Sequence, residues 1–126
     1  MLSESKAFSG FAVDDIEAAR RFYGETLGVS VELVDQDNGL LMLHLGGGTD
    51  VLIYPKADHT PASYTILNFP VANIEAAVAD LAARGVVFER YDGIDQDELG
   101  INRGEGPLIA WFTDPAGNII SVLQDS

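Results

Sequence analysis

The sequence predicts an α+β fold of two tandem βαβββ modules, and the main reason is an internal repeat. Residues 11–19 read FAVDDIEAA and residues 69–77 read FPVANIEAA, so six of nine positions are identical at a separation of 58 residues. Beyond the helix the match resumes at a separation of 57, where a Gly-Val pair at 28–29 corresponds to one at 85–86. A strand, a helix and a glycine stop therefore occur twice in the same order.

Length and composition predict one domain with its own core. The chain has 126 residues, of which 47% are hydrophobic, and this is enough to bury a core without crosslinks. We expect a single domain over 1–126, with module one at about 6–54, a linker at 55–62 and module two at about 63–124. The chain has no cysteine, which excludes disulfides and thiolate metal sites and suits a reducing cytoplasm.

The charge is strongly acidic, with 20 Asp and Glu against 7 Lys and Arg and a net charge of −13. We therefore expect no nucleic acid or anionic membrane as a partner, because both are bound through basic patches. The acidity has two interpretations, attraction of a cationic ligand or a well-solvated surface. No basic segment followed by an apolar run opens the chain, and no window approaches the roughly 18 apolar residues of a membrane helix. We expect a soluble cytoplasmic protein.

In module one the first strand is expected at 6–13, where apolar residues alternate with small or polar ones. Asp14 or Asp15 then caps a helix over about 15–27, whose apolar residues recur at spacings of three and four. Gly28 ends it, because glycine adopts positive φ without strain. The later strands are expected, with turns between them, at 29–34, 40–45 and 51–54.

Module two repeats this order. A strand at 64–71 leads through the cap Asn73 into a helix that ends at Arg84, before Gly85. The acidic segment at 92–106 has no periodicity, and such loops are either functional lids or simply mobile. The other strands are expected at 86–91, 108–112 and 119–123.

Several motifs together resemble one known family. The segment VDDIEAA at 13–19 is followed by Phe-Tyr at 22–23 and Leu-Gly at 27–28, and the turn DPAGN at 114–118 precedes the last strand. This combination resembles the vicinal oxygen chelate superfamily, which includes glyoxalase I, bleomycin resistance proteins and extradiol dioxygenases, over about residues 8–123. The resemblance implies an incompletely closed mixed β-barrel with helices outside, a ligand cavity within it, and a homodimer.

The resemblance also implies where a metal would be held. Metal-using members carry histidine or glutamine on the opening strand of a module and glutamate on its last strand. Imidazole and carboxylate are the donors that divalent ions need. In this chain the corresponding positions on the opening strands hold Phe8 and Ile66. The position on the last strand of module two holds Ser121, and counting back along the repeat gives Ile53 for module one. The two histidines, His44 and His59, have no carboxylate at a spacing that suggests a shared site. We therefore expect no metal and no cofactor.

Strand alternation separates the core from the ligand side. Phe11 and Phe69 are identical in the two modules and belong to the face beneath the helices. The opposite face differs between the modules, as expected for a cavity adapted to one asymmetric ligand. It is expected to be mainly apolar, with Asn68 and Ser121 as its polar groups, which suits binding more than proton transfer. By the same alternation along each strand, the residues expected on this ligand-side face are Phe8, Gly10, Ala12, Val51, Ile53, Ile66, Asn68, Pro70, Ile119, Ser121 and Leu123.

The remaining candidates each have two interpretations. His44 is a general base near neutrality or a structural residue. Glu89 polarises a substrate or, like Glu32 at the same place in module one, is a solvent-facing charge. Trp111 and Tyr91 stack on a ligand or pack in the core.

Two candidates lie in connecting segments. Arg103 belongs to the long acidic segment, and we assign it a lid contact with the ligand or a solvated charge. Asp114 is expected to serve its turn by accepting hydrogen bonds from the backbone.

Two functions follow from these residues. The first is a metal-free protein that binds or sequesters a small apolar or cationic molecule, as bleomycin resistance proteins sequester their drug. The second is a lyase, isomerase or dioxygenase of the glyoxalase type, which needs a metal or acid–base work by His44 with Glu89 or Tyr91. The absent ligand residues favour the first, and the sequence does not identify the small molecule.

Overall fold

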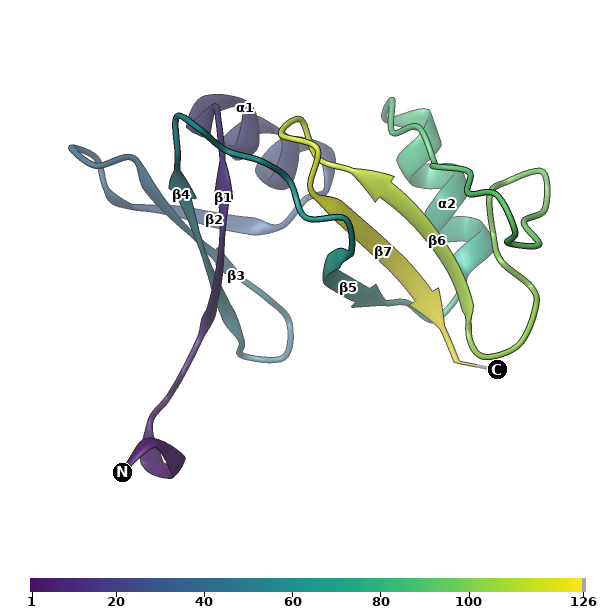
Figure 1. Cartoon of the computed structure of the whole chain (residues 1–126), viewed down its shortest axis with the longest axis horizontal. Coiled ribbons are helices and arrows are strands. Elements are labelled where there is room, and N and C mark those ends of the chain that lie inside the picture. The colour runs from purple at the N-terminus through teal and green to yellow at the C-terminus, as the bar shows by residue number, and fades with distance from the viewer. Residues whose placement is uncertain (126) are drawn as a thin grey trace. The chain divides into compact units, whose positions relative to one another are not determined.

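The computed structural model describes residues 1–125 and contains two compact units (Figure 1). The first unit is Met1–Thr60 and the second begins at Pro61. Each unit has one mixed sheet and one main helix, which confirms the α+β class. Within residues 1–125, every helix is too short or too polar to cross a membrane.

The first unit follows the predicted βαβββ order after a short 3-10 turn, η1 (Leu2–Glu4). Its sheet has the strand order β1-β4-β3-β2, in which β1 is parallel to β4 and the other pairs are antiparallel. The elements that follow η1 are β1 (Ser9–Val13), α1 (Ile16–Arg21), η2 (Phe22–Thr26), β2 (Ser30–Asp35), β3 (Leu40–His44) and β4 (Asp50–Pro55).

The helical connection of the first unit begins as predicted and ends differently. The Asp15 side chain caps α1 by accepting a hydrogen bond from the Ala18 N–H at 3.1 Å. The expected helix over 15–27 changes at Phe22 into a π-helical turn, where the Leu27 N–H donates to the Phe22 carbonyl over five residues. Gly24 weakens regular helix inside this turn, because glycine is a poor helix former. The α-helix is therefore shorter than the apolar spacing predicts.

One face of the first sheet packs against this helical segment. The Phe11 ring lies 5.7 Å from the ring of buried Tyr23 in η2. Phe11 is paired with Ile53, and Ile53 with Leu41, so all three belong to the same face. The prediction that Phe11 lies beneath the helix is confirmed.

The second unit has a three-stranded sheet in the order β5-β7-β6, with β5 parallel to β7 and β6 antiparallel to it. Asn73 caps α2 by accepting a hydrogen bond from the Ala76 N–H at 3.1 Å. Buried Ile74 and Val78 of α2 belong to the same core as the alternate residues of β6 and β7. The elements are β5 (Thr65–Pro70), α2 (Ile74–Ala83), β6 (Leu108–Thr113) and β7 (Ile119–Gln124).

The strand expected at 86–91 is not a regular strand. Phe88 forms an isolated antiparallel bridge with Phe112 of β6, and the Glu89 N–H donates to the Trp111 carbonyl at 2.7 Å. Two residues later the Tyr91 N–H donates to the Gln96 side chain at 2.8 Å instead of to β6. The segment therefore follows β6 briefly and then leaves it.

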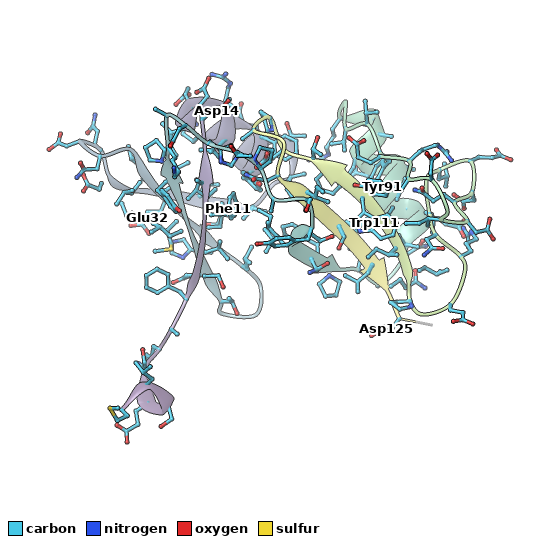
Figure 2. The ribbon with its side chains drawn as sticks, viewed as in Figure 1. Phe11, Asp14, Glu32, Tyr91, Trp111 and Asp125 are labelled. Atoms are coloured by element: carbon cyan, nitrogen blue, oxygen red, sulfur yellow. The ribbon has the colours of Figure 1, made fainter. Side chains whose placement is uncertain are left out.

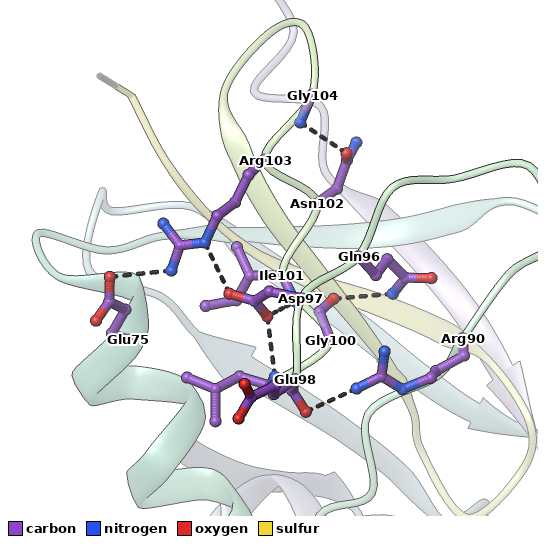
Figure 3. Close-up of polar contacts among 11 residues, drawn as sticks. Glu75, Arg90, Gln96, Asp97, Glu98, Gly100, Ile101, Asn102, Arg103 and Gly104 are labelled. Atoms are coloured by element: carbon purple, nitrogen blue, oxygen red, sulfur yellow. Dashed lines mark hydrogen bonds and ion pairs between the residues drawn. The ribbon is translucent and has the colours of Figure 1, made fainter.

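The segment at 92–106 is held by side chains (Figure 3). The Gln96 amide donates to the carbonyls of Glu89 and Gly100 at 2.9 and 2.8 Å. Asp97 accepts hydrogen bonds from the Leu99 and Ile101 N–H groups, each at 2.9 Å. These bonds satisfy backbone groups that regular secondary structure would otherwise pair. The segment is therefore a structured loop and not a loose connection.

Candidate functional site

Each sheet has a face that packs against its helix and a face that points the other way. In the first sheet this second face carries residues that lie opposite one another across all four strands. We call them row one, which consists, from β1 to β2, of Gly10, Leu52, Met42 and Glu32.

The second sheet has a matching row on its own second face. Asn68, Ser121 and Trp111 are paired across β5, β7 and β6, and the segment beside β6 adds Glu89 opposite Trp111. We call Asn68, Ser121, Trp111 and Glu89 row two. The prediction that Asn68 and Ser121 share a face is confirmed by this register.

The two rows correspond position by position, and this corrects one assignment. Gly10 and Asn68 are 58 residues apart, the separation of the repeat. Gly10 is paired with Leu52 and Asn68 with Ser121, so the module-one counterpart of Ser121 is Leu52. The sequence count that selects Ile53 is one residue out of register. Leu52 has no metal-binding atom either.

Ile53 lies on the helix-packed face. It is paired with Phe11 and is 0% exposed, and Val51 two residues earlier shares its face. The prediction that Ile53 and Val51 lie on the ligand side is wrong, because a one-residue shift along a strand moves a side chain to the other face.

Phe8 and Ile66, the two residues at the family's metal positions on the opening strands, lie outside regular strand pairing. Phe8 precedes β1 and is exposed. Ile66 is half-buried at a register shift between Thr65 and Leu67. Contact of Phe8, Ile66, Gly10, Asn68 and Ser121 with a ligand stays a prediction.

Two carboxylates hold His44, at the edge of row one. Its Nε2 lies 2.8 Å from Glu32 Oε1, and its Nδ1 lies 2.8 Å from Asp50 Oδ1. Sequence reasoning missed both partners, because Glu32 and Asp50 reach His44 only through the register of β2, β3 and β4. The Glu32 hydrogen bond, and then the Asp50 hydrogen bond, raise the pKa of His44. This arrangement favours the imidazolium form over a free general base.

The stability that His44 contributes should depend on pH. Its folded-state pKa lies above the ordinary value of about 6.5, so the contribution is fully present below that value and is lost as pH rises through the raised pKa. We expect the melting temperature of His44→Gln to fall furthest below wild type at acidic pH and to approach it in alkaline buffer. Thermal unfolding across pH 5–9 checks this. A difference that stays constant with pH contradicts it.

An aromatic pair lies beside row two (Figure 2). The rings of Tyr91 and Trp111 are edge to face, with centroids 5.5 Å apart and planes at 73°. Both side chains are half-buried. Burial, and then the negative charge of Glu89, raise the pKa of the Tyr91 hydroxyl, so it stays protonated at neutral pH. Contact of Trp111 or Tyr91 with a ligand stays a prediction.

Arg103 ties the loop to the helix of the second unit (Figure 3). Its Nε donates to Asp97 Oδ2 at 2.7 Å, and its Nη2 donates to Glu75 Oε1 at 3.0 Å. Glu75 lies in the first turn of α2. The structure therefore gives Arg103 two partners within the protein, and a contact between Arg103 and a ligand stays a prediction.

Asp114 supports the turn before β7. Its Oδ1 accepts hydrogen bonds from the N–H groups of Ala116 and Asn118, each at 2.9 Å. Its Oδ2 accepts from the Asn118 side-chain amide at 3.0 Å. The predicted turn role is confirmed.

Comparison with solved structures shows the same fold in several proteins. A putative glyoxalase family protein from Bacillus anthracis is 22% identical with a TM-score of 0.72, and the match covers 100% of both chains. TnmS3, an antibiotic binding protein from Streptomyces sp. CB03234, is 26% identical with a TM-score of 0.71, and the match covers 98% of both chains. The fosfomycin resistance protein FosX from Listeria monocytogenes is 12% identical with a TM-score of 0.71, over 98% of this chain and 94% of FosX.

A search of curated proteins by sequence gave no match. The family model described as "Glyoxalase/Bleomycin resistance protein/Dioxygenase superfamily" matches residues 8–122. This match spans most of the chain, and it agrees with the fold and with the repeated modules. The chain therefore belongs to the Glyoxalase/Bleomycin resistance protein/Dioxygenase superfamily.

Proposed function

We propose that this chain is a binding member of the superfamily that holds a small apolar or cationic molecule without a metal ion. The observation that carries the proposal is the composition of the two rows, each of which combines apolar or aromatic side chains (Leu52 and Met42, or Trp111) with a few polar ones (Glu32, or Asn68, Ser121 and Glu89). Such surfaces are typical of small-molecule sites. The solved structure of TnmS3, an antibiotic binding protein, supports a binding role within this fold.

The residues at the family's metal positions do not fit a divalent ion. Leu52 and Phe8 have no donor atoms, and the Ser121 hydroxyl donates to Asn68 Oδ1 at 2.5 Å, so these two polar groups serve each other. Over residues 1–125, no three His, Asp or Glu side chains are arranged to hold a metal. The cluster around His44 does not change this, because its carboxylates lie at opposite ring nitrogens.

The acid–base alternative has less support. A glyoxalase-type lyase, isomerase or dioxygenase that used His44 as a base would need a free ring nitrogen, and both nitrogens lie at hydrogen-bond distance from carboxylates. Tyr91 is a poor base as well, since its raised pKa keeps it protonated. These contacts favour binding over catalysis.

Metal reconstitution tests the proposal. After exposure to Ni²⁺, Zn²⁺, Mn²⁺ or Fe²⁺ and dialysis, we expect elemental analysis to find well below one metal ion per chain. We also expect no consumption of methylglyoxal with glutathione by the reconstituted protein. One tightly held ion per chain that supports turnover would refute a metal-free binding role.

A further inference from the structure

We propose that Glu89, Trp111 and Tyr91 form a subsite for the cationic head group of an organic ligand. The inference rests on the proposed binding function and deepens it, because it names the chemical class of the ligand and the residues that recognise it. The ligand would carry an ammonium, amidinium or guanidinium group next to an apolar body.

The local geometry brings a carboxylate and two aromatic rings together. The bridge between Phe88 and Phe112, with the hydrogen bond from the Glu89 N–H to the Trp111 carbonyl, sets Glu89 opposite Trp111. Opposite residues of an antiparallel pair share a face. Tyr91 contacts Trp111 edge to face, and Glu89 is close enough for its charge to act on the Tyr91 hydroxyl.

The Glu89 carboxylate has no partner of its own. It is half-buried, and no hydrogen bond or ion pair joins it to any of residues 1–125. Two other acidic side chains of the second unit, Asp97 and Glu75, do have a counterion, because both bind Arg103. A half-buried charge that lacks a counterion is unfavourable, and a bound cation removes that cost.

The repeat provides an internal comparison. Glu32 occupies the place of Glu89 in row one and is hydrogen-bonded to His44, which supplies a cation when it is protonated. His44 is paired with Asp50, and the matching pair in the second unit is Thr113 with Ile119. The second unit therefore has the corresponding glutamate but not the histidine beside it, and Trp111 stands where the first unit has Met42. A ligand that brings its own cation would restore the contact.

The side chains present suit this ligand class. The faces of Trp and Tyr rings attract cations, and a neighbouring carboxylate adds a charge-assisted hydrogen bond. The net charge of −13 also raises the local concentration of cations near the protein. An anionic ligand would meet repulsion from Glu89.

Benzamidine, benzamide and benzoate test the subsite, because they share one shape and differ in charge. Trp111 is the only tryptophan, so its indole N–H gives a single resonance in an ¹H–¹⁵N correlation spectrum. We expect benzamidine to shift this resonance in a saturable way and to bind roughly tenfold more tightly than benzamide. Benzoate should bind weakest.

A pair of variants assigns the charge preference to one residue. Glu89→Gln keeps the shape and removes the charge, and it should lower benzamidine affinity most of the way toward that of benzamide without changing benzamide binding. Glu105→Gln removes an equal charge from an exposed loop position and should leave all three affinities unchanged. The ratio of benzamidine to benzamide affinity in wild type stands as a test on its own if Glu89→Gln does not fold.

Several results would overturn the subsite. If benzamidine and benzamide shift the indole resonance equally, the cation preference is wrong, while small-molecule binding at this face stands. If Glu89→Gln retains the preference, Glu89 is not its source. If benzamidine leaves the resonance unmoved, the subsite is wrong, and native mass spectrometry decides the proposed binding function separately.

Discussion

Phe112→Ala should lower the free energy of unfolding by about 3–5 kcal/mol. Phe112 of β6 is 1% exposed, and its ring lies edge to face with the ring of Phe88, with the centroids 5.6 Å apart. Truncation to alanine removes this contact and leaves a cavity that the surrounding strands fill only in part. It also loosens the bridge through which Phe88 holds the start of the segment after α2 against β6. This core position should therefore give the largest loss of stability among single substitutions in the second unit.

Urea unfolding followed by Trp111 fluorescence measures the effect, because Trp111 is next to Phe112 in the same strand. Val87→Ala is the matched control, since Val87 is adjacent to Phe88 and 79% exposed. We expect this control to change the free energy by less than about 0.5 kcal/mol. Equal losses in the two variants would show that Phe112 is not part of a packed core.

Asp114→Ala should destabilise the second unit by about 3 kcal/mol. Asp114 is 4% exposed, and its carboxylate accepts hydrogen bonds from the backbone N–H groups of Ala116 and Asn118 and from the Asn118 side-chain amide. Alanine leaves these donors without their acceptor in a buried turn. The same urea titration, monitored at Trp111, reports the change.

Asp114→Asn distinguishes the contributions of the two carboxylate oxygens to the stability of the turn. Its amide oxygen still accepts from the backbone N–H groups, while its NH₂ group meets the Asn118 NH₂ group, so we expect an intermediate loss. Asp92→Ala, which removes an exposed acidic side chain, should have little effect. The account of the turn fails if Asp114→Ala is as mild as Asp92→Ala.

The features that the sequence predicts well are local in the chain. Asp15 and Asn73 cap their helices as expected, because a cap acts on backbone groups within three residues. Gly28 and Gly85 end the helical segments with φ of 72° and 95°, which glycine adopts without strain. The internal repeat also predicts where both helices and most strands lie in the sequence, since the same local signals occur twice.

Contacts that depend on strand register escaped sequence analysis. His44 lies 12 residues from Glu32 and 6 residues from Asp50 in the chain, and only the pairing of three strands brings the three side chains together. Ile53 was assigned to the wrong face by a count one residue out of register. In both cases the physical cause is the alternation of side chains, which makes facing depend on exact pairing.

The segment at 86–106 shows a second limit. Its apolar start at 86–91 predicts a strand, yet the Gln96 side chain takes the Tyr91 N–H that a strand partner would use. Gln96 and Arg103 organise the loop through bonds to the backbone and to α2. Nothing in an acidic, aperiodic stretch of sequence indicates that one glutamine will hydrogen-bond the backbone and order the loop. The sequence therefore predicts only a lid or a mobile loop.

Native mass spectrometry of freshly purified protein, before and after treatment with EDTA, tests the central claim most directly. We predict a folded chain whose mass exceeds the sequence mass by that of one small organic molecule, with the excess unchanged by EDTA. A chain that carries one metal ion, and that loses both the ion and the small molecule when EDTA is added, would contradict metal-independent binding.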